Sequence, residues 1–190
     1  DVRRIATVVR AAGRRLLIDA MSAFGVLPLD SRMPFDAVAA SSNKGLQGSP
    51  GLAFVIARKS ALEEARYNAD SLVLDLYAQW KGFEKNGQWR FTPPTHCVLA
   101  LSRALDELTA EGGVRGRFAR YTANCATLVN GMRALGFRTL LPDAVQAPVI
   151  VTFHMPADPA FVFDDFYARL AASGFIIYPG KLTERPSFRV

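Results

Sequence analysis

Two short apolar runs, each followed by a polar group, constrain the fold of this chain more than any other feature. The first run covers residues 15–19 and ends in Asp19, and the second covers residues 35–40 and leads through a Ser-Ser-Asn segment to Lys44. Short apolar runs separated by helix-like segments and glycine loops are typical of buried strands in an α/β sheet. Open α/β sheets place ligand-binding groups at the carboxyl ends of their strands. The sequence therefore predicts an α/β fold with Asp19 and Lys44 at a ligand-binding edge.

A carboxylate and a lysine at such strand ends are the two groups that pyridoxal phosphate chemistry needs from a protein. The lysine forms a Schiff base, and the carboxylate keeps the pyridine nitrogen protonated so that the ring withdraws electrons. The Ser-Ser-Asn segment can contact the phosphate or the ring oxygen, and the glycines of the following loop let the backbone approach a flat ring (Gly45, Gly48 and Gly51). Two ordinary alternatives stay open from the residues alone: a solvated loop lysine, and an aspartate that only caps a turn.

Composition and charge narrow the class of protein further. Half of the 190 residues are apolar and a fifth are charged, which allows a substantial core. The net charge of +6 comes from basic residues spread singly or in pairs, a distribution that fits anionic small molecules better than nucleic acid or a membrane surface. Neither the two cysteines nor the two histidines show the spacing of a metal site, so we expect no metal and a reduced, cytoplasmic protein.

The order of the expected elements predicts two domains. A helix over residues 1–12, strands at 15–19, 35–41 and 51–58, a short helix capped by Ser60 and a helix from about Tyr77 precede a proline break at 89–94. Helices at 95–111 and 114–135 follow, then strands at 137–141 and 149–154, a helix at 160–172 and strands at 175–178 and 187–190. We expect an α/β domain over residues 1–112 and a small α+β domain over 113–190. Because both termini fall within expected elements, we also expect a fragment of a longer protein.

Five segments carry a resemblance to a known family. They read IDAMSAFG, SSNKGLQGSPGLAFVIAR, SLVLDLYAQW, WRFTPPTH and GFIIYPGKLTERPSFRV. Together they closely resemble the 2-aminoethylphosphonate:pyruvate transaminases, which belong to the class V aminotransferases of pyridoxal phosphate fold type I. The resemblance covers nearly the whole chain. It implies the second half of a fold type I large domain, including the long interdomain helix, followed by an incomplete small domain, with both ends of the protein missing.

The resemblance also implies roles for individual residues. Lys44 corresponds to the Schiff-base lysine, Asp19 to the partner of the pyridinium nitrogen and Asn43 to a neighbouring cofactor contact. Thr92 corresponds to a threonine that reaches the phosphate of a cofactor held by the other subunit of a homodimer, so we expect it to lie away from Lys44 of its own chain. Arg189 corresponds to the arginine that binds the anionic end of the substrate.

The implied reaction moves the amino group of 2-aminoethylphosphonate to pyruvate, with pyridoxal 5′-phosphate as cofactor. Another class V activity, such as alanine:glyoxylate or serine:pyruvate transamination, is the first alternative, and a non-catalytic fragment is the second. The family's phosphate-binding loop and ring-stacking aromatic are absent from this chain. We therefore expect the isolated chain to be inactive and to expose apolar strand surface.

Overall fold

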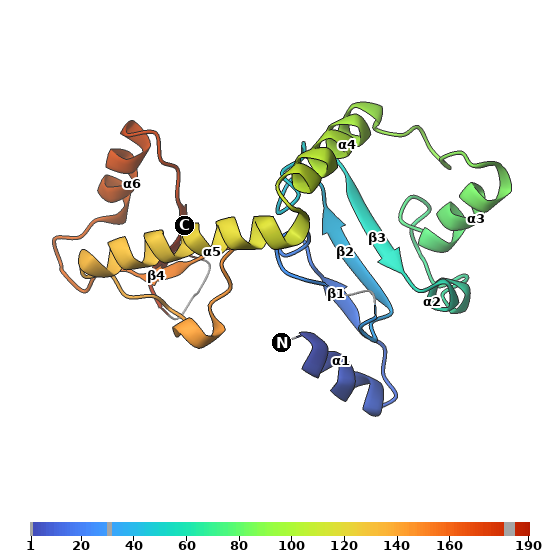
Figure 1. Cartoon of the computed structure of the whole chain (residues 1–190), viewed down its shortest axis with the longest axis horizontal. Coiled ribbons are helices and arrows are strands. Elements are labelled where there is room, and N and C mark those ends of the chain that lie inside the picture. The colour runs from blue at the N-terminus through green and yellow to red at the C-terminus, as the bar shows by residue number, and fades with distance from the viewer. Residues whose placement is uncertain (1, 30–31, 181–184) are drawn as a thin grey trace. The chain divides into compact units, whose positions relative to one another are not determined.

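The computed structural model describes residues 2–29, 32–180 and 185–190 and contains two compact units, Asp1–Arg115 and Gly116–Val190 (Figure 1). The division between the units lies near the start of the long helix α5 (Gly113–Ala134), close to the boundary expected at residue 112. No helix in the described ranges is long and apolar enough to cross a membrane.

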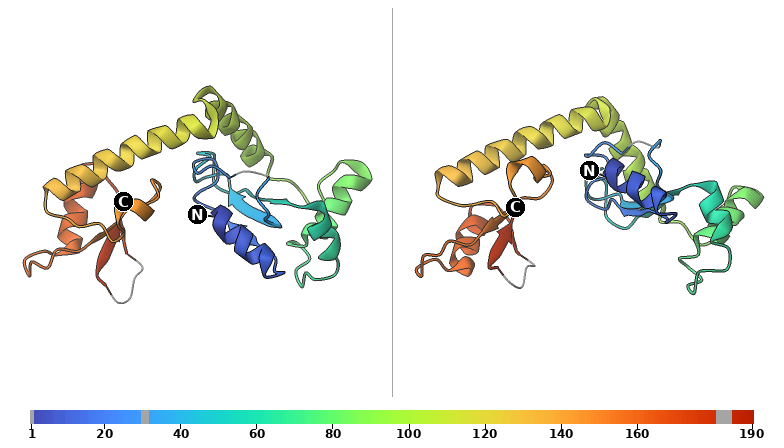
Figure 2. Two further views of the ribbon diagram at one scale, coloured as in Figure 1. Left: turned by 60° about the horizontal axis from the view of Figure 1, so that its bottom comes forward. Right: turned by 90° about the horizontal axis from the view of Figure 1, so that it is seen from below.

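The first unit is built on a three-stranded sheet. Helix α1 (Val2–Ala11) leads into β1 (Leu17–Asp19), which is followed by β2 (Ala37–Ser41) and β3 (Ala53–Ala57) in the order β1-β2-β3. Strands β1 and β2 are parallel, with Asp19 opposite Ala39, whereas β3 runs antiparallel to β2 with Ala53 opposite Ser41. Helices α2 (Lys59–Glu64), α3 (Leu76–Asn86) and α4 (Thr95–Ala110) complete the unit (Figures 1 and 2).

The core of the first unit lies on one face of its sheet. Val38 and Phe35 are buried there with Ala20 and Met33. The other face is less covered within the described residues: the side chain of Leu17, the first residue of β1, is 72% exposed, and Val55, which shares this face, is also exposed. A groove of about 480 Å³ runs along this face between β1, β2 and the segment around α2. The expected exposure of apolar strand surface is therefore present.

The second unit combines α5 with a small antiparallel sheet. Its elements are the 3-10 turn η1 (Asp143–Val145), β4 (Thr152–His154), α6 (Phe163–Ala172), β5 (Tyr178–Pro179) and β6 (Ser187–Arg189). The strand order is β4-β6-β5, so the last strand in the sequence is the central one. The rings of Phe153 and Phe188 are fully buried and stack on each other, and α5 and α6 pack against them.

Several expected details of secondary structure are wrong. The strand expected at 175–178 overlaps the observed strand β5 only at Tyr178. Residues 137–141 do not form a strand: pairing is limited to one bridge between Thr139 and Phe153, because Phe137 turns into the aromatic core and Pro142 leads into η1. Helix α2 begins at Lys59 with Arg58 as its N-cap, so Ser60 is not the cap. Helix α6 begins at Phe163, later than the expected residue 160.

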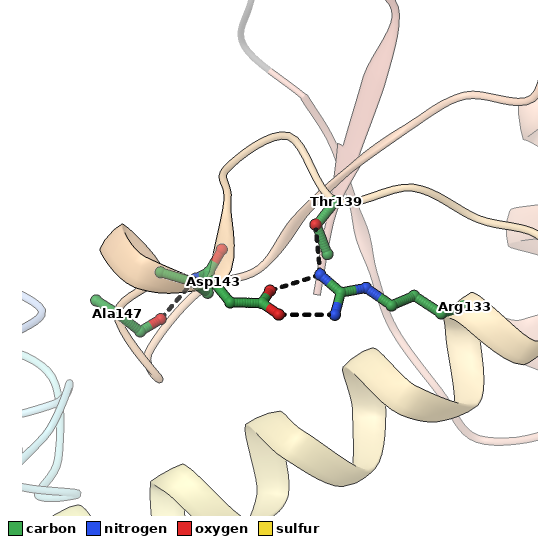
Figure 3. A network of polar contacts seen from close by, with 5 residues as sticks. Arg133, Thr139, Asp143 and Ala147 are labelled. Atoms are coloured by element: carbon green, nitrogen blue, oxygen red, sulfur yellow. Dashed lines mark hydrogen bonds and ion pairs between the residues drawn. The ribbon is translucent and has the colours of Figure 1, made fainter.

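An exposed ion pair joins the end of α5 to the first residue of η1 (Figure 3). Arg133 donates from Nη1 to Asp143 Oδ2 (3.0 Å) and from Nη2 to Asp143 Oδ1 (2.5 Å) and Thr139 Oγ1 (3.0 Å). The hydrogen bonds from Arg133 lower the pKa of Asp143, and the same bonds raise the pKa of Arg133. Burial, together with the nearby Asp143 charge, raises the pKa of the Cys125 thiol.

Candidate cofactor site

Asp19 and Lys44 lie at the same edge of the first unit's sheet. Asp19 is the last residue of β1, and Lys44 follows the end of β2 at Ser41. The two strands are parallel neighbours, and their ladder continues where the Ala20 N–H donates to the Ala39 carbonyl oxygen (2.9 Å). Carboxyl ends of parallel strands meet at one edge of a sheet. The structure thus has the strand-end arrangement that the sequence predicts for these two residues.

The Asp19 carboxylate is exposed, and only one of its two oxygens accepts a hydrogen bond from the described residues. Its Oδ1 accepts a hydrogen bond from the Met21 N–H (2.9 Å), which stabilises the turn that leaves β1. The other carboxylate oxygen has no partner among the described residues. Asp19 is therefore a turn cap, as the ordinary alternative holds, and still offers an acceptor to a ligand.

Lys44 lies on a loop that is closed by hydrogen bonds at its base. The hydroxyl of the fully buried Ser42 donates to the carbonyl oxygens of Ser49 (2.5 Å) and Leu52 (3.2 Å). The Gly48 N–H donates to the Ser42 carbonyl oxygen (2.7 Å), and the Gln47 N–H donates to that of Lys44 (2.9 Å). These bonds fix the backbone on both sides of Lys44, while its side chain is exposed.

The loop after β1 and the loop after β2 pack against each other through glycines. A Cβ atom at Gly45 would overlap the carbonyl oxygen of Phe24 and lie 2.8 Å from Val26 Cγ2. A Cβ atom at Gly25, whose φ is +84°, would lie 2.7 Å from Leu46 Cδ2. This close packing sets the position of the Lys44 loop relative to the turn that follows Asp19.

These contacts give the glycines a packing role within the protein that the sequence analysis did not assign to them. Gly45 is required by the Phe24 carbonyl, and Gly48 lies against the Ser42 carbonyl oxygen, 2.9 Å from where its Cβ would be. Gly51 has a φ of +116° and faces the Sγ atom of Cys97. The Cβ side of each of the three glycines is thus filled by the protein's own atoms.

A buried hydroxyl tests whether this edge fits pyridoxal 5′-phosphate. Ser41 Oγ is buried at the end of β2 and has no hydrogen-bond partner among the described residues. Buried polar groups are nearly always paired, so an unpaired one indicates a missing polar partner. In the parallel register Ser41, two residues beyond Ala39, shares a sheet face with Asp19. A hydroxyl, a carboxylate, the half-buried Asn43 amide and the Lys44 amine form a donor set that fits this cofactor.

The remaining predicted site residues lie elsewhere. Thr92 is exposed in the loop between α3 and α4, where it precedes Pro93 and the N-cap Pro94, and no hydrogen bond of the described residues joins it to the Lys44 loop. Arg189 belongs to β6 of the second unit, between Thr152 and Tyr178 in the sheet register. The sequence did not indicate the Phe24–Gly45 contact or the proximity of Tyr178 to Arg189.

Comparison with known proteins decides the family. The family model described as "Aminotransferase class-V" matches residues 1–189. The chain belongs to the class V aminotransferases. It is 57% identical over 187 residues to a 2-aminoethylphosphonate–pyruvate transaminase of Pseudomonas fluorescens, covering 98% of this chain and 51% of the relative. It is 52% identical over 190 residues to the enzyme of the same name from Cupriavidus necator, covering 100% and 50%.

Solved structures agree on the fold. An aspartate aminotransferase of subgroup IV from Thermus thermophilus superposes with a TM-score of 0.83 at 25% identity, covering 98% of this chain and 52% of that one. A pyridoxamine–pyruvate aminotransferase from Mesorhizobium loti gives a TM-score of 0.83 at 22% identity, covering 98% and 48%. The predicted fold, part of a fold type I aminotransferase, is confirmed. The chain spans about half the length of the curated relatives it matches.

Proposed function

We propose that the full-length protein containing this chain is a pyridoxal 5′-phosphate-dependent transaminase in phosphonate catabolism. It moves the amino group of 2-aminoethylphosphonate to pyruvate, leaving phosphonoacetaldehyde and L-alanine. The observation that carries the proposal is the meeting of Asp19 and Lys44 at one sheet edge in a class V aminotransferase. The substrate pair is supported by the names of relatives that are 52% to 57% identical over nearly the whole chain.

Each candidate residue has a chemical task in this proposal. When bound, the cofactor supplies an electron sink for the carbon that carries the amino group. The Lys44 amine would hold the cofactor, and the same amine would act as the general base that takes a proton from the carbon bearing the amino group. The free Asp19 oxygen would hold the ring nitrogen in its protonated form, and Asn43 would be a further residue that holds the cofactor. Arg189 binds the phosphonate of one substrate and the carboxylate of the other.

We infer a homodimer in which Thr92 contacts the cofactor phosphate of the partner subunit. The segment around α3 supports an interface because it exposes a concentration of large apolar side chains within residues 67–91 (Tyr67, Leu72, Val73, Leu74, Phe83, Trp89 and Phe91). Large apolar side chains left exposed close together in the sequence are candidates for an interaction site. Thr92 directly follows this segment. The two free cysteines fit the reducing cytoplasm, where we place the protein.

Covalent trapping of the cofactor tests the proposal. Full-length protein is loaded with pyridoxal 5′-phosphate, reduced with borohydride, digested and analysed by mass spectrometry. The added mass is expected on the peptide that contains Lys44, and Lys44→Ala should lose it together with alanine formation, by about 10² to 10⁴-fold. Label on another lysine, or alanine formation by Lys44→Ala at the wild-type rate, would refute the assignment.

A pair of aspartates provides a matched test of the sheet edge. Asp19→Asn removes the charge at the carboxyl end of β1 and should lower kcat strongly. Asp36 lies just before the start of β2, where its Oδ2 accepts a hydrogen bond from the Leu16 N–H (2.8 Å). Asp36→Asn keeps an acceptor there and should leave kcat close to the wild-type value. Equal effects of the two substitutions would show that the charge of Asp19 has no special role.

Substrate competition separates the proposal from its alternatives. The ratio kcat/KM is measured for 2-aminoethylphosphonate, alanine and serine as amino donors, with pyruvate or glyoxylate as acceptor. Preference for alanine or serine would assign the protein to another class V activity. The isolated 190-residue chain is measured in parallel and is expected to form no alanine, because it spans only half the length of its relatives.

A further inference from the structure

The sheet of the second unit has one apolar and one polar face. Side chains alternate along a strand, so the burial of Phe153 and Phe188 against α5 and α6 assigns their neighbours to the opposite face. Strand β6 is central, and the register sets Arg189 between Thr152 on β4 and Tyr178 on β5. Arg189 is thus flanked on both sides on the face that points away from the aromatic core.

Two polar atoms on the polar face are buried without a hydrogen-bond partner in the described residues. One is Arg189 Nε, and the other is the hydroxyl of Ser187, which lies against the Cα atom of Gly180. No hydrogen bond of the described residues therefore fixes the direction of the Arg189 guanidinium. Its position depends on what it packs against.

The packing partner is the ring of Tyr178. The guanidinium carbon of Arg189 lies 5.9 Å from the Tyr178 ring centroid, within the range of a cation–π contact. The two residues face each other across the β5–β6 ladder, so the contact is built into the strand register. Tyr178 is itself 60% exposed, so it adds little to the hydrophobic core.

We propose that Tyr178 is a positioning residue that orients the Arg189 guanidinium to bind the anionic end of the substrate. A planar guanidinium gains most from two parallel hydrogen bonds to a phosphonate or carboxylate, and only when it is already turned to present them. The ring face of Tyr178 limits that rotation. This inference rests on the proposed function, in which Arg189 binds the anion.

A double-mutant cycle in the full-length holoenzyme tests the inference. Tyr178→Leu should raise the KM for both 2-aminoethylphosphonate and pyruvate by about three- to thirtyfold, with kcat within about twofold of wild type. Tyr178→Phe keeps the ring face and should restore both KM values. In the background of Arg189→Ala, Tyr178→Leu should change kcat/KM no further, because the two residues act as one unit.

Controls separate this effect from damage to the unit. Phe175 is an aromatic side chain of the same unit, 65% exposed and outside both strands, and Phe175→Leu should leave both KM values unchanged. If Tyr178→Leu aggregates, Tyr178→Val replaces it, since valine favours strands.

The outcomes of these measurements separate the role of Tyr178 from the proposed anion-binding role of Arg189. An unchanged KM in Tyr178→Leu, while Arg189→Ala raises KM, overturns the role of Tyr178 and leaves the proposed function intact. A loss in Tyr178→Phe as large as in Tyr178→Leu would show that the hydroxyl acts instead of the ring face, which also overturns the inference. Equal effects of Tyr178→Leu with and without Arg189 would show independent action. If Arg189→Ala leaves KM unchanged, the anion-binding part of the proposed function fails.

Discussion

Replacing Gly45 by alanine tests whether the packing between the two loops sets the catalytic geometry. A methyl carbon at Gly45 would lie 2.8 Å from Val26 Cγ2, whereas ordinary contact begins at 3.4 Å, so the loops must separate by about 0.6 Å. The methyl group would also overlap the Phe24 carbonyl oxygen, which cannot rotate away as a side chain can. Gly45 is not among the glycines with positive φ, so the effect is steric and not a matter of backbone strain.

The expected consequences are a moderate loss of stability and a larger loss of rate. Overpacking of a tight site costs about 1–3 kcal/mol. A misplacement of about 1 Å can cost about a hundredfold in rate, so a shift of this size should lower kcat of the full-length protein by about ten- to a hundredfold. Urea unfolding and steady-state alanine formation measure the two effects separately.

Gly131 provides the matched control. It lies within α5, and a Cβ atom there would meet nothing within 4 Å. Gly131→Ala should therefore leave kcat unchanged and stabilise the helix by about 0.5–1 kcal/mol. If Gly45→Ala behaves like Gly131→Ala in both measurements, the two loops do not hold Lys44 in place.

Three further predictions concern stability and are checked by urea unfolding of the full-length protein. Phe153→Ala should cost about 3–5 kcal/mol because the ring is fully buried, and a cost below about 1 kcal/mol would contradict the aromatic core described for the second unit. Ser42→Ala should lower stability by about 1–3 kcal/mol and speed hydrogen exchange at the Gly48 amide, because the hydrogen bonds of the hydroxyl that close the Lys44 loop are lost. Unchanged exchange at Gly48 would show that these hydrogen bonds do not hold the loop closed. The pKa of Asp143 is lowered below its ordinary value of 3.8, so its ion pair with Arg133 stabilises the fold above that pH and loses its effect as the pH falls through the lowered value. Asp143→Asn should therefore be less stable than wild type near neutral pH, and the difference should shrink as the pH falls through the lowered pKa of Asp143. A difference that does not shrink with falling pH would exclude the ion pair as its cause.

The strand ends could be predicted from the sequence because they depend on local pattern. Apolar runs that stop at Asp19 and before the Ser-Ser-Asn segment place β1 and β2 within about two residues of their observed limits. The direction of β3 was not predicted, although a signal for it exists. Residues 42–52 contain no helix pattern, and a connection that short joins neighbouring strands only in the antiparallel sense.

Other features depend on contacts that no local pattern encodes. The fit of Gly45 against the Phe24 carbonyl depends on the turn geometry of two separate loops, so the sequence showed the glycines but not this packing contact. The expected strand at 137–141 failed for a similar reason. Phenylalanine is common in strands, but the ring of Phe137 packs against Phe166 and Phe188 in the core, and the residue does not extend the ladder.

The residues on the two faces of strand β6 differ in how much a substitution would disturb the core. Phe188 is locked into the core, whereas its neighbours on the strand face the other way. Exchanges at Thr152, His154 or Tyr178 therefore alter the surroundings of Arg189 without removing any atom from the buried aromatic cluster. Under the proposed role of Arg189 in anion binding, substitutions on this face are expected to change which anion is preferred, with little penalty to folding.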